Sequence, residues 1–123
     1  MGKTVTVCVI DDDHLVRRTM CEALEGAGFA TVEAGDGDEG LKAIERSRAH
    51  VAVIDIIMPS REGLDVIVEA TRRFPQLKIL AISGGGQMGP TDYLELAHQL
   101  GAHDTLAKPF RNADFVDKVK RLV

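Results

Sequence analysis

Residues able to do chemistry stand at the ends of separate apolar runs of the sequence. Residues 11–13 are three consecutive aspartates that follow one run, and Asp55 ends another. Ser83 and Lys108 stand at the ends of two more. Carboxylates brought together without His or Cys favour a hard cation such as Mg²⁺. A lysine and a hydroxyl beside that cation suit a phosphoryl group, and a carboxylate can itself be the nucleophile that forms an aspartyl phosphate.

Five strands, each followed by a helix, are predicted to position these residues. Continuous β-branched runs predict the strands, and apolar side chains at helical spacing predict the helices. The predicted strands are residues 4–10, 30–34, 51–54, 78–82 and 103–107. The predicted helices are residues 14–27, a helix opened by Asp36 and lined by Leu41 and Ile44, one lined by Leu64, Ile67, Val68 and Thr71, residues 91–100, and one lined by Phe115, Val116, Val119, Leu122 and Val123.

This alternation predicts an α/β fold. The strands are continuous apolar runs instead of alternating patterns, which is typical of a parallel sheet covered on both faces. A doubly wound sheet of five strands is the topology that right-handed crossovers favour. All carboxyl ends of such strands lie at one edge, where ligands bind. Because the 123 residues contain no linker, residues 1–123 are predicted to form a single domain.

Composition argues against several classes of function. The 19 acidic and 15 basic residues are interspersed and give a net charge of −4, so direct binding of nucleic acid is not expected. The sequence has no signal peptide, no apolar run of membrane-spanning length and no lipidation motif, which predicts a cytoplasmic protein without a membrane partner. Cys8 and Cys21 form no CxxC motif and are predicted to be buried thiols instead of a redox pair.

Four stretches of the chain resemble the receiver domain of two-component response regulators. They are VIDDDHLVRR, VIDIIMPSREGLDVI, LAISG and AKPF, which begin near residues 9, 53, 80 and 107. The resemblance covers the whole chain. The chain is similar to the chemotaxis regulators that consist of a receiver domain alone. The resemblance implies a (βα)5 flavodoxin-like fold with strand order 2-1-3-4-5, which would make the strands before residues 11–13 and before Asp55 neighbours.

The resemblance also implies a magnesium site. Asp55 would be the phosphoacceptor and a direct ligand of Mg²⁺. Asp12 would bind the ion through its carboxylate, and Ile57 would bind it through its backbone carbonyl. Asp11 would act mostly through a metal-bound water molecule.

Three positions on other strands would contact the phosphoryl group. In the resemblance, Ser83 donates a hydrogen bond to the phosphoryl oxygens and Lys108 forms an ion pair with them. Gly84 matches a position where a small residue leaves room for the phosphoryl group. Pro109 matches a proline that usually follows a cis peptide bond.

Two features depart from the pattern of the family. Thr105 stands three residues before the lysine, where an aromatic side chain usually reports phosphorylation by swinging inward. We therefore expect output through the surface of the last two helices and the strand between them, by another rearrangement. The glycine-rich residues 84–89 are predicted to be disordered without phosphate and ordered after phosphorylation, with a merely flexible loop as the alternative.

Neighbours of the acidic run have simpler interpretations. Asp13 is predicted to cap the following helix, where a carboxylate suits the exposed N–H groups and the helix dipole; tuning of the metal site is the alternative. His14 is predicted to be an exposed residue of the first helical turn. Arg17 and Arg18 are predicted to lie on a solvated helix face.

The leading hypothesis is a signalling module switched by phosphorylation. It would take a phosphoryl group from a histidine kinase or a histidine phosphotransfer protein onto Asp55. It would not be an enzyme in the ordinary sense, because it would catalyse only its own phosphorylation and dephosphorylation. Output would come from binding a downstream target protein, unless the chain is a piece cut from a longer regulator.

Two alternatives remain open at this point. Asp11 and Asp13 have the spacing of the nucleophile motif of haloacid-dehalogenase-like phosphatases, with Asp11 as nucleophile. Against this, Leu15 stands where Thr or Val is usual, and no acidic pair follows Lys108 to hold the metal. The other alternative is a receiver-like interaction domain that is never phosphorylated, against which the complete set of acids and the lysine argues.

Overall fold

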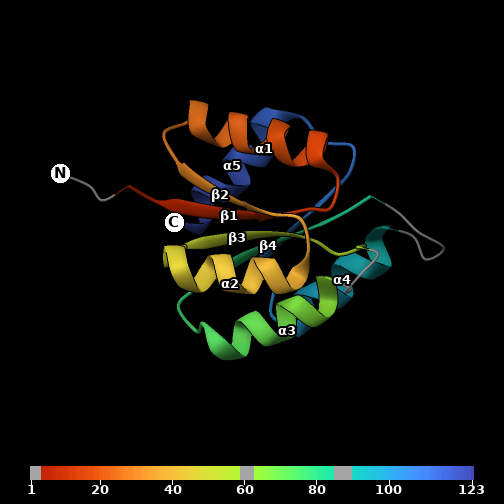
Figure 1. Ribbon diagram of the computed structural model, residues 1–123. Helices are drawn as coiled ribbons and strands as arrows, with labels where there is room; N and C mark the ends of the chain where they lie inside the picture. The colour runs from red at the N-terminus through yellow and green to blue at the C-terminus, as the bar shows by residue number, and fades with distance from the viewer. Residues whose placement is uncertain (1–3, 59–62, 85–89) are drawn as a thin grey trace.

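The computed structural model describes residues 4–58, 63–84 and 90–123, with residues 90–93 described by their backbone alone. Five strands alternate with five helices along these ranges (Figure 1). The strands are β1 (Thr6–Ile10), β2 (Ala30–Ala34), β3 (Val51–Asp55), β4 (Lys78–Ser83) and β5 (Asp104–Ala107). The helices are α1 (His14–Gly26), α2 (Gly37–Ser47), α3 (Gly63–Arg73), α4 (Pro90–Leu100) and α5 (Asn112–Leu122).

All five strands form one parallel sheet in the order β2-β1-β3-β4-β5. The predicted α/β fold and strand order are therefore confirmed. The order reverses between β1 and β3, which pair in the register Ile10↔Ile54. Asp11, which follows β1, and Asp55, the last residue of β3, consequently lie side by side at the carboxyl edge of the sheet.

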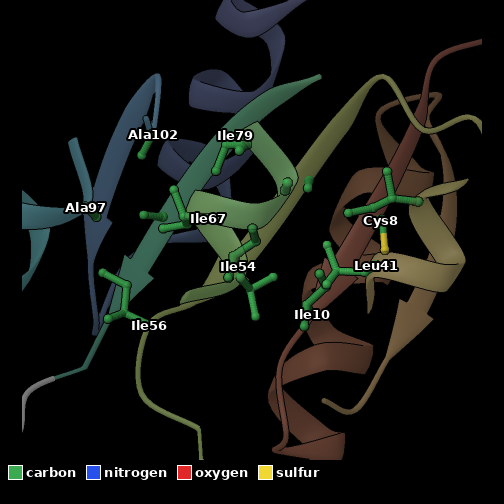
Figure 2. Close-up of a cluster of buried hydrophobic side chains, with 14 of the residues drawn as sticks. Cys8, Ile10, Leu41, Ile54, Ile56, Ile67, Ile79, Ala97 and Ala102 are labelled. Atoms are coloured by element: carbon green, nitrogen blue, oxygen red, sulfur yellow. The ribbon is translucent and has the colours of Figure 1, made fainter. Parts of the chain in front are cut away.

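Helices cover both faces of the sheet, with α1 and α5 on one side and α2, α3 and α4 on the other (Figure 1). Each layer encloses its own apolar cluster, because successive side chains of a strand point to opposite faces. Leu24 of α1 and Phe115 of α5 are fully buried against one face of the central strands. Figure 2 shows the second cluster, in which Leu41, Ile54 and Ile67 come from α2, β3 and α3.

The apolar faces of the helices largely follow their predicted spacing, but three residues predicted to line them are exposed: Val68 and Thr71 of α3, and Val123 after the end of α5. Leu64 and Ile67 are buried as expected, but Val68 has an exposed fraction of 46%. Val66 is fully buried in its place. The reason is geometric: α3 is covered along the stripe through residues 63, 66, 67 and 70, and Val68 lies outside this stripe.

The two cysteines are buried thiols, as predicted. Cys8 packs in the cluster under α2 and α3, and Cys21 packs in the cluster on the opposite face. Burial raises the pKa of the Cys8 thiol to about 12 and that of the Cys21 thiol to about 11. Both groups therefore stay protonated at neutral pH and act as small apolar side chains.

Side chains cap the first two helices. Asp13 precedes α1, and its carboxylate accepts hydrogen bonds from the N–H groups of Leu15 and Val16, which confirms its predicted role. Asp36 accepts from the N–H of Glu39 at 2.8 Å. The Glu39 carboxylate accepts a hydrogen bond from the N–H of Gly35 at 3.5 Å. The two side chains thus cap α2 from both directions, except that Glu39 contacts Gly35 instead of the N-cap residue Asp36.

The predicted ordering of the glycine-rich loop falls mainly on residues 85–89, which lie outside the described residues. Within the described ranges, no helix is both long and apolar enough to cross a membrane.

Candidate functional site

The switch between β1 and β3 gathers three carboxylates at the carboxyl edge of the sheet. One carboxylate oxygen from each of Asp11, Asp12 and Asp55 lies within 4.8 Å of the other two. Asp11 and Asp55 are buried, with exposed fractions of 1% and 6%, while Asp12 is exposed. The sequence therefore predicted correctly which acids converge, and the open side of the cluster faces solvent through Asp12.

Each polar group of Asp11 has a partner. Its N–H donates to the carbonyl oxygen of Ala34 at 3.2 Å, which ties it to the end of β2. One carboxylate oxygen accepts the N–H of Asp13 at 2.9 Å, and the other lies 3.2 Å from Nζ of Lys108. Its carbonyl oxygen accepts a hydrogen bond of 2.7 Å from Nη1 of Arg17. This buried acid is consequently fixed in position and orientation.

Lys108 supplies the positive charge of the cluster. It follows β5, its N–H donates to the carbonyl of Ser83 at 2.9 Å, and its peptide bond to Pro109 is cis, as predicted. Its Nζ lies 3.2 Å from Asp11 and 3.4 Å from Asp55. Burial lowers the pKa of Lys108, but the charges of Asp55 and Asp11 outweigh this and raise it, so the ammonium form is held.

Among the described carboxyl groups, that of Asp55 has the most strongly shifted pKa. Burial and the charge of Asp11 raise the pKa of Asp55, while Lys108 and the N–H of Ile57 lower it. The result is a pKa of about 6. Ile57 donates that hydrogen bond at 3.1 Å. The carboxyl is thus mainly ionised at neutral pH, yet it would be stabilised by further positive charge.

Ser83 and Gly84 complete the edge beside Lys108. Ser83 is fully buried, and its Oγ has no hydrogen-bond partner among the described residues. Such a group is costly unless a ligand engages it. A Cβ on Gly84 would stand 3.2 Å from Cδ of Lys108. A larger residue there would press on the lysine side chain; the predicted need to leave room for a phosphoryl group stays a prediction.

These residues suit a hard divalent cation. The donors are carboxylate oxygens, with neither His nor Cys in the cluster, and Mg²⁺ prefers one or two carboxylates together with water and phosphate oxygens. Two of the three acids are buried close together with a single lysine between them, so an added cation would relieve their repulsion. The donor set thus fits the ion that the sequence predicted.

Two contributors to the site were missed in the sequence, and the first is Gly63. The Cβ of any other residue at this position would overlap the carbonyl oxygen of Asp55 and lie 2.6 Å from Cα of Ile56. Only glycine therefore lets α3 begin against the end of β3. A glycine at the start of a predicted helix that follows an acidic strand end was the available signal.

The second is Arg17, for which the predicted solvated helix face was wrong, whereas the Arg18 side chain has an exposed fraction of 36% and agrees with that prediction. Both guanidinium groups pair with Glu33 on β2, and Arg17 also contacts Asp11 as described above. The side chain of Arg17 has an exposed fraction of 15%. The pairing joins residues 16 positions apart, so helical periodicity alone could not reveal it.

The fold and the edge site together define a doubly wound α/β protein of the receiver type. The family model described as the response regulator receiver domain matches residues 7–120. The chain belongs to the response regulator receiver domain family of two-component signalling. This membership separates it from the haloacid-dehalogenase-like phosphatases considered above.

Relatives and solved structures agree with this assignment. The chain is 30% identical to the "Probable chemotaxis protein CheY" of Rhizobium etli, and the match covers 100% of this chain and 92% of that protein. It is 32% identical to the DNA-binding transcriptional regulator NtrC of Salmonella typhimurium over 95% of this chain, which is 24% of NtrC. A response regulator from Thermotoga maritima matches with a TM-score of 0.84 and 26% identity, covering 98% of both chains.

The relatives differ in how much of their length this chain spans. It spans nearly all of the CheY relative but about a quarter of NtrC. The shared part is the receiver domain, a signalling module and not an enzyme of the ordinary kind. Activities that belong to the rest of the longer relatives are not assigned by this match.

Proposed function

We propose that the protein is a phosphorylation-dependent switch in which Asp55 accepts a phosphoryl group from a phosphohistidine donor. The observation that carries this proposal is the arrangement of the Asp55 carboxyl. It lies within 4.8 Å of carboxylate oxygens of Asp11 and Asp12, and 3.4 Å from Nζ of Lys108. A nucleophilic carboxylate, a site for a hard cation and a fixed ammonium group are the parts that phosphoryl transfer requires.

The residues would divide the work as follows. A carboxylate oxygen of Asp55 attacks phosphorus while the bond from phosphorus to the donor imidazole nitrogen breaks. Lys108 then pairs with the phosphoryl oxygens, for which its Nζ is already placed between Asp11 and Asp55. The buried hydroxyl of Ser83, which lacks a partner among the described residues, donates a hydrogen bond to the same group.

Asp11, Asp12 and Asp55 would hold Mg²⁺, together with the backbone carbonyl of Ile57 that the family resemblance implies. When bound, Mg²⁺ neutralises charge on the phosphoryl oxygens. The raised pKa of Asp55 reflects a burial and repulsion that a cation would relieve. The ionised carboxylate would then be available as nucleophile over a wider pH range.

A hollow beside Lys108 offers the phosphodonor protein a place to dock. Its volume is about 500 Å³, and it lies between the start of α1 and the loop after β5. Leu15 at its rim has an exposed fraction of 76%, the largest among the apolar side chains described as exposed. The lining residues are Leu15, Val16, Thr19, Met20, Gly84, Lys108, Pro109, Phe110 and Asn112. We infer that a histidine kinase or a histidine phosphotransfer protein binds there, in the cytoplasm.

Phosphorylation would change the binding of a downstream target protein. Ser83 ends β4 and Lys108 follows β5. Their movement toward a phosphoryl group would therefore shift the neighbouring surface formed by α4, β5 and α5. Thr105 on β5, which pairs with Ala81, replaces the usual aromatic reporter of the family. Output would therefore use these elements without an aromatic swing.

The test is the intact mass of the protein after treatment with a small phosphodonor such as acetyl phosphate, with and without Mg²⁺. Wild type should gain one phosphoryl group only with Mg²⁺, and Asp55→Asn should gain none. Asp13→Asn is the matched control, because Asp13 caps α1 and asparagine caps equally well; it should label like wild type. Labelling of Asp55→Asn that is lost in Asp11→Asn would instead support a phosphatase-like nucleophile. No adduct on wild type would support a receiver-like domain that is never phosphorylated.

A further inference from the structure

Arg17 connects the acidic loop to the edge strand of the sheet. Its Nη1 donates to the carbonyl oxygen of Asp11 at 2.7 Å, and its Nε donates to Glu33 on β2 at 3.0 Å. A third nitrogen, Nη2, lies 3.0 Å from Nδ1 of His14. All three nitrogens of the guanidinium group are thus engaged, and one of their partners is the backbone of a predicted metal-site residue.

The location of this cation is unexpected on electrostatic grounds. A positive charge near three carboxylates that are to hold Mg²⁺ repels the ion and, through charge alone, weakens its binding. Glu33 offsets part of the charge, because its hydrogen bonds with Arg18 and Arg17 outweigh burial and lower the pKa of Glu33. The ion pair with Glu33 accounts for the charge of Arg17, and the hydrogen bond to the carbonyl of Asp11 is its contact with the acidic loop.

We propose that Arg17 is a positioning residue of the metal site, which holds the carbonyl of Asp11 and thereby sets the direction of the Asp12 carboxylate. This proposal rests on the proposed function, because it assumes that Mg²⁺ binds these acids. The carbonyl of Asp11 belongs to the peptide plane that joins Asp11 to Asp12. Fixing that plane removes one of the backbone rotations that would otherwise let the exposed Asp12 turn away.

Magnesium makes such positioning important. Mg²⁺ demands nearly octahedral geometry with short metal–oxygen distances, unlike the larger and more tolerant Ca²⁺. Groups that orient metal ligands without touching the metal commonly change affinity by about 10- to 100-fold when removed. The other partners of Asp11 hold its N–H and its carboxylate, so Arg17 is the contact that the structure gives to its carbonyl.

Arg18 provides a matched comparison within the same network. It pairs with the same carboxylate, Glu33, from the next position of α1. Among the described residues, its hydrogen bond goes to Glu33 and not to the backbone of Asp11. Replacing either arginine removes one positive charge and one link between α1 and β2, but only replacement of Arg17 releases the carbonyl of Asp11.

The experiment is a titration with Mg²⁺ alone, in which backbone amide chemical shifts in NMR spectra measure the affinity. The proteins compared are wild type, Arg17→Gln, Arg17→Lys and Arg18→Gln. Arg17→Gln should bind Mg²⁺ at least about tenfold more weakly than wild type, and Arg17→Lys should recover part of this loss. Arg18→Gln should stay within about twofold of wild type, since it leaves the loop intact. In metal-free protein, the carbonyl ¹³C shift of Asp11 should move in Arg17→Gln and stay in Arg18→Gln.

Each outcome separates the two proposals. If wild type does not bind Mg²⁺, the proposed function fails at the metal site. If wild type binds and Arg17→Gln binds equally or more tightly, charge dominates and Arg17 is not a positioning residue. Equal weakening in Arg17→Gln and Arg18→Gln would also overturn the inference, because it would show a general loosening of α1. Urea unfolding of each variant establishes that the affinities compare folded proteins.

Discussion

The two edges of the sheet treat their polar groups in opposite ways. At the amino edge, the N–H of Thr6 donates to Nδ1 of His50 at 3.0 Å, and the N–H of Ile79 donates to Nδ1 of His103 at 3.1 Å. Imidazole nitrogens thus accept hydrogen bonds from backbone groups near the starts of these strands. At the carboxyl edge, Asp11 and Asp55 are buried close together around one lysine.

The difference shows which edge of the sheet carries polar groups that cost stability. At the amino edge, these backbone N–H groups already have acceptors in the imidazole rings. The carboxyl edge keeps an acid with a raised pKa and a buried hydroxyl, that of Ser83, without a partner among the described residues. Uncompensated groups of this kind concentrate at functional sites. The following predictions test this contrast, from the largest expected effect to the smallest.

Removing Lys108 should leave the repulsion between Asp11 and Asp55 at the carboxyl edge uncompensated. Lys108→Met leaves Asp11 and Asp55 without their cation, so the free energy of unfolding at pH 7.5 without metal should fall by about 3–4 kcal/mol. The loss should shrink toward pH 4, because the Asp55 carboxyl, with a pKa of about 6, is then neutral. Urea unfolding at both pH values measures it. An equal loss at both would mean that packing of the lysine stem, and not charge, accounts for the effect.

Adding one carbon at Gly63 should distort the same edge. In Gly63→Ala the new Cβ meets backbone atoms of β3, which cannot swing aside as a side chain can. We expect a loss of about 2–3 kcal/mol in the free energy of unfolding, with slower Mg²⁺-dependent phosphorylation. Gly26→Ala is the control, since a Cβ at this position of α1 would meet nothing within 4 Å. Gly63→Ala with the stability of Gly26→Ala would contradict the close approach.

Neutralising Asp55 should stabilise the metal-free protein. The pKa of Asp55 is raised from 3.8 to about 6 in the folded state. The folded state therefore binds more protons than the unfolded state between these values, and stability falls as pH rises through that window. Asp55→Asn should then raise the free energy of unfolding by about 2 kcal/mol at pH 7.5 and by little at pH 4. A variant less stable than wild type at pH 7.5 would show that the carboxylate stabilises the fold.

Replacing His103 at the amino edge should give the smallest change in stability, in the opposite direction to that of Asp55→Asn. Burial, with Lys78 and His98 nearby, lowers the pKa of His103 in the folded state. Its contribution is present above the unfolded pKa of 6.5 and is lost as pH falls below it. His103→Ala should cost about 1 kcal/mol at pH 7.5 by removing the acceptor of Ile79 N–H, and less at pH 5. Urea unfolding at both pH values decides this, and a cost that grows at pH 5 would contradict the neutral imidazole.

The architecture could be predicted from the sequence because local and global signals agree. Continuous apolar runs indicated the five strands, helical spacing indicated the helices, and parallel strands with right-handed crossovers leave few topologies. The order of the strands required the resemblance to receivers. The error at Val68 arose because periodicity defines an apolar stripe, while neighbouring helices decide how far each side of that stripe is covered.

The site could be predicted in part. Strand ends are sequence features, so the convergence of Asp11, Asp12, Asp55 and Lys108 followed once the strand order was assumed. The contact of Arg17 with Asp11 could not be predicted, because it depends on how α1 packs against β2. The roles of these residues in phosphoryl transfer stay predictions until labelling is measured.

The register of β1 and β3 has a consequence for how this chain can change. Ile10 is level with Ile54, so the spacing between Asp11 and Asp55 is set by the hydrogen bonds between β1 and β3 in the interior of the protein. Insertion of one residue in β1 would shift the acids by about 3.3 Å and turn alternate side chains to the opposite face. Substitutions can adjust the chemistry of this edge gradually, whereas any change in strand length would remove it in a single event.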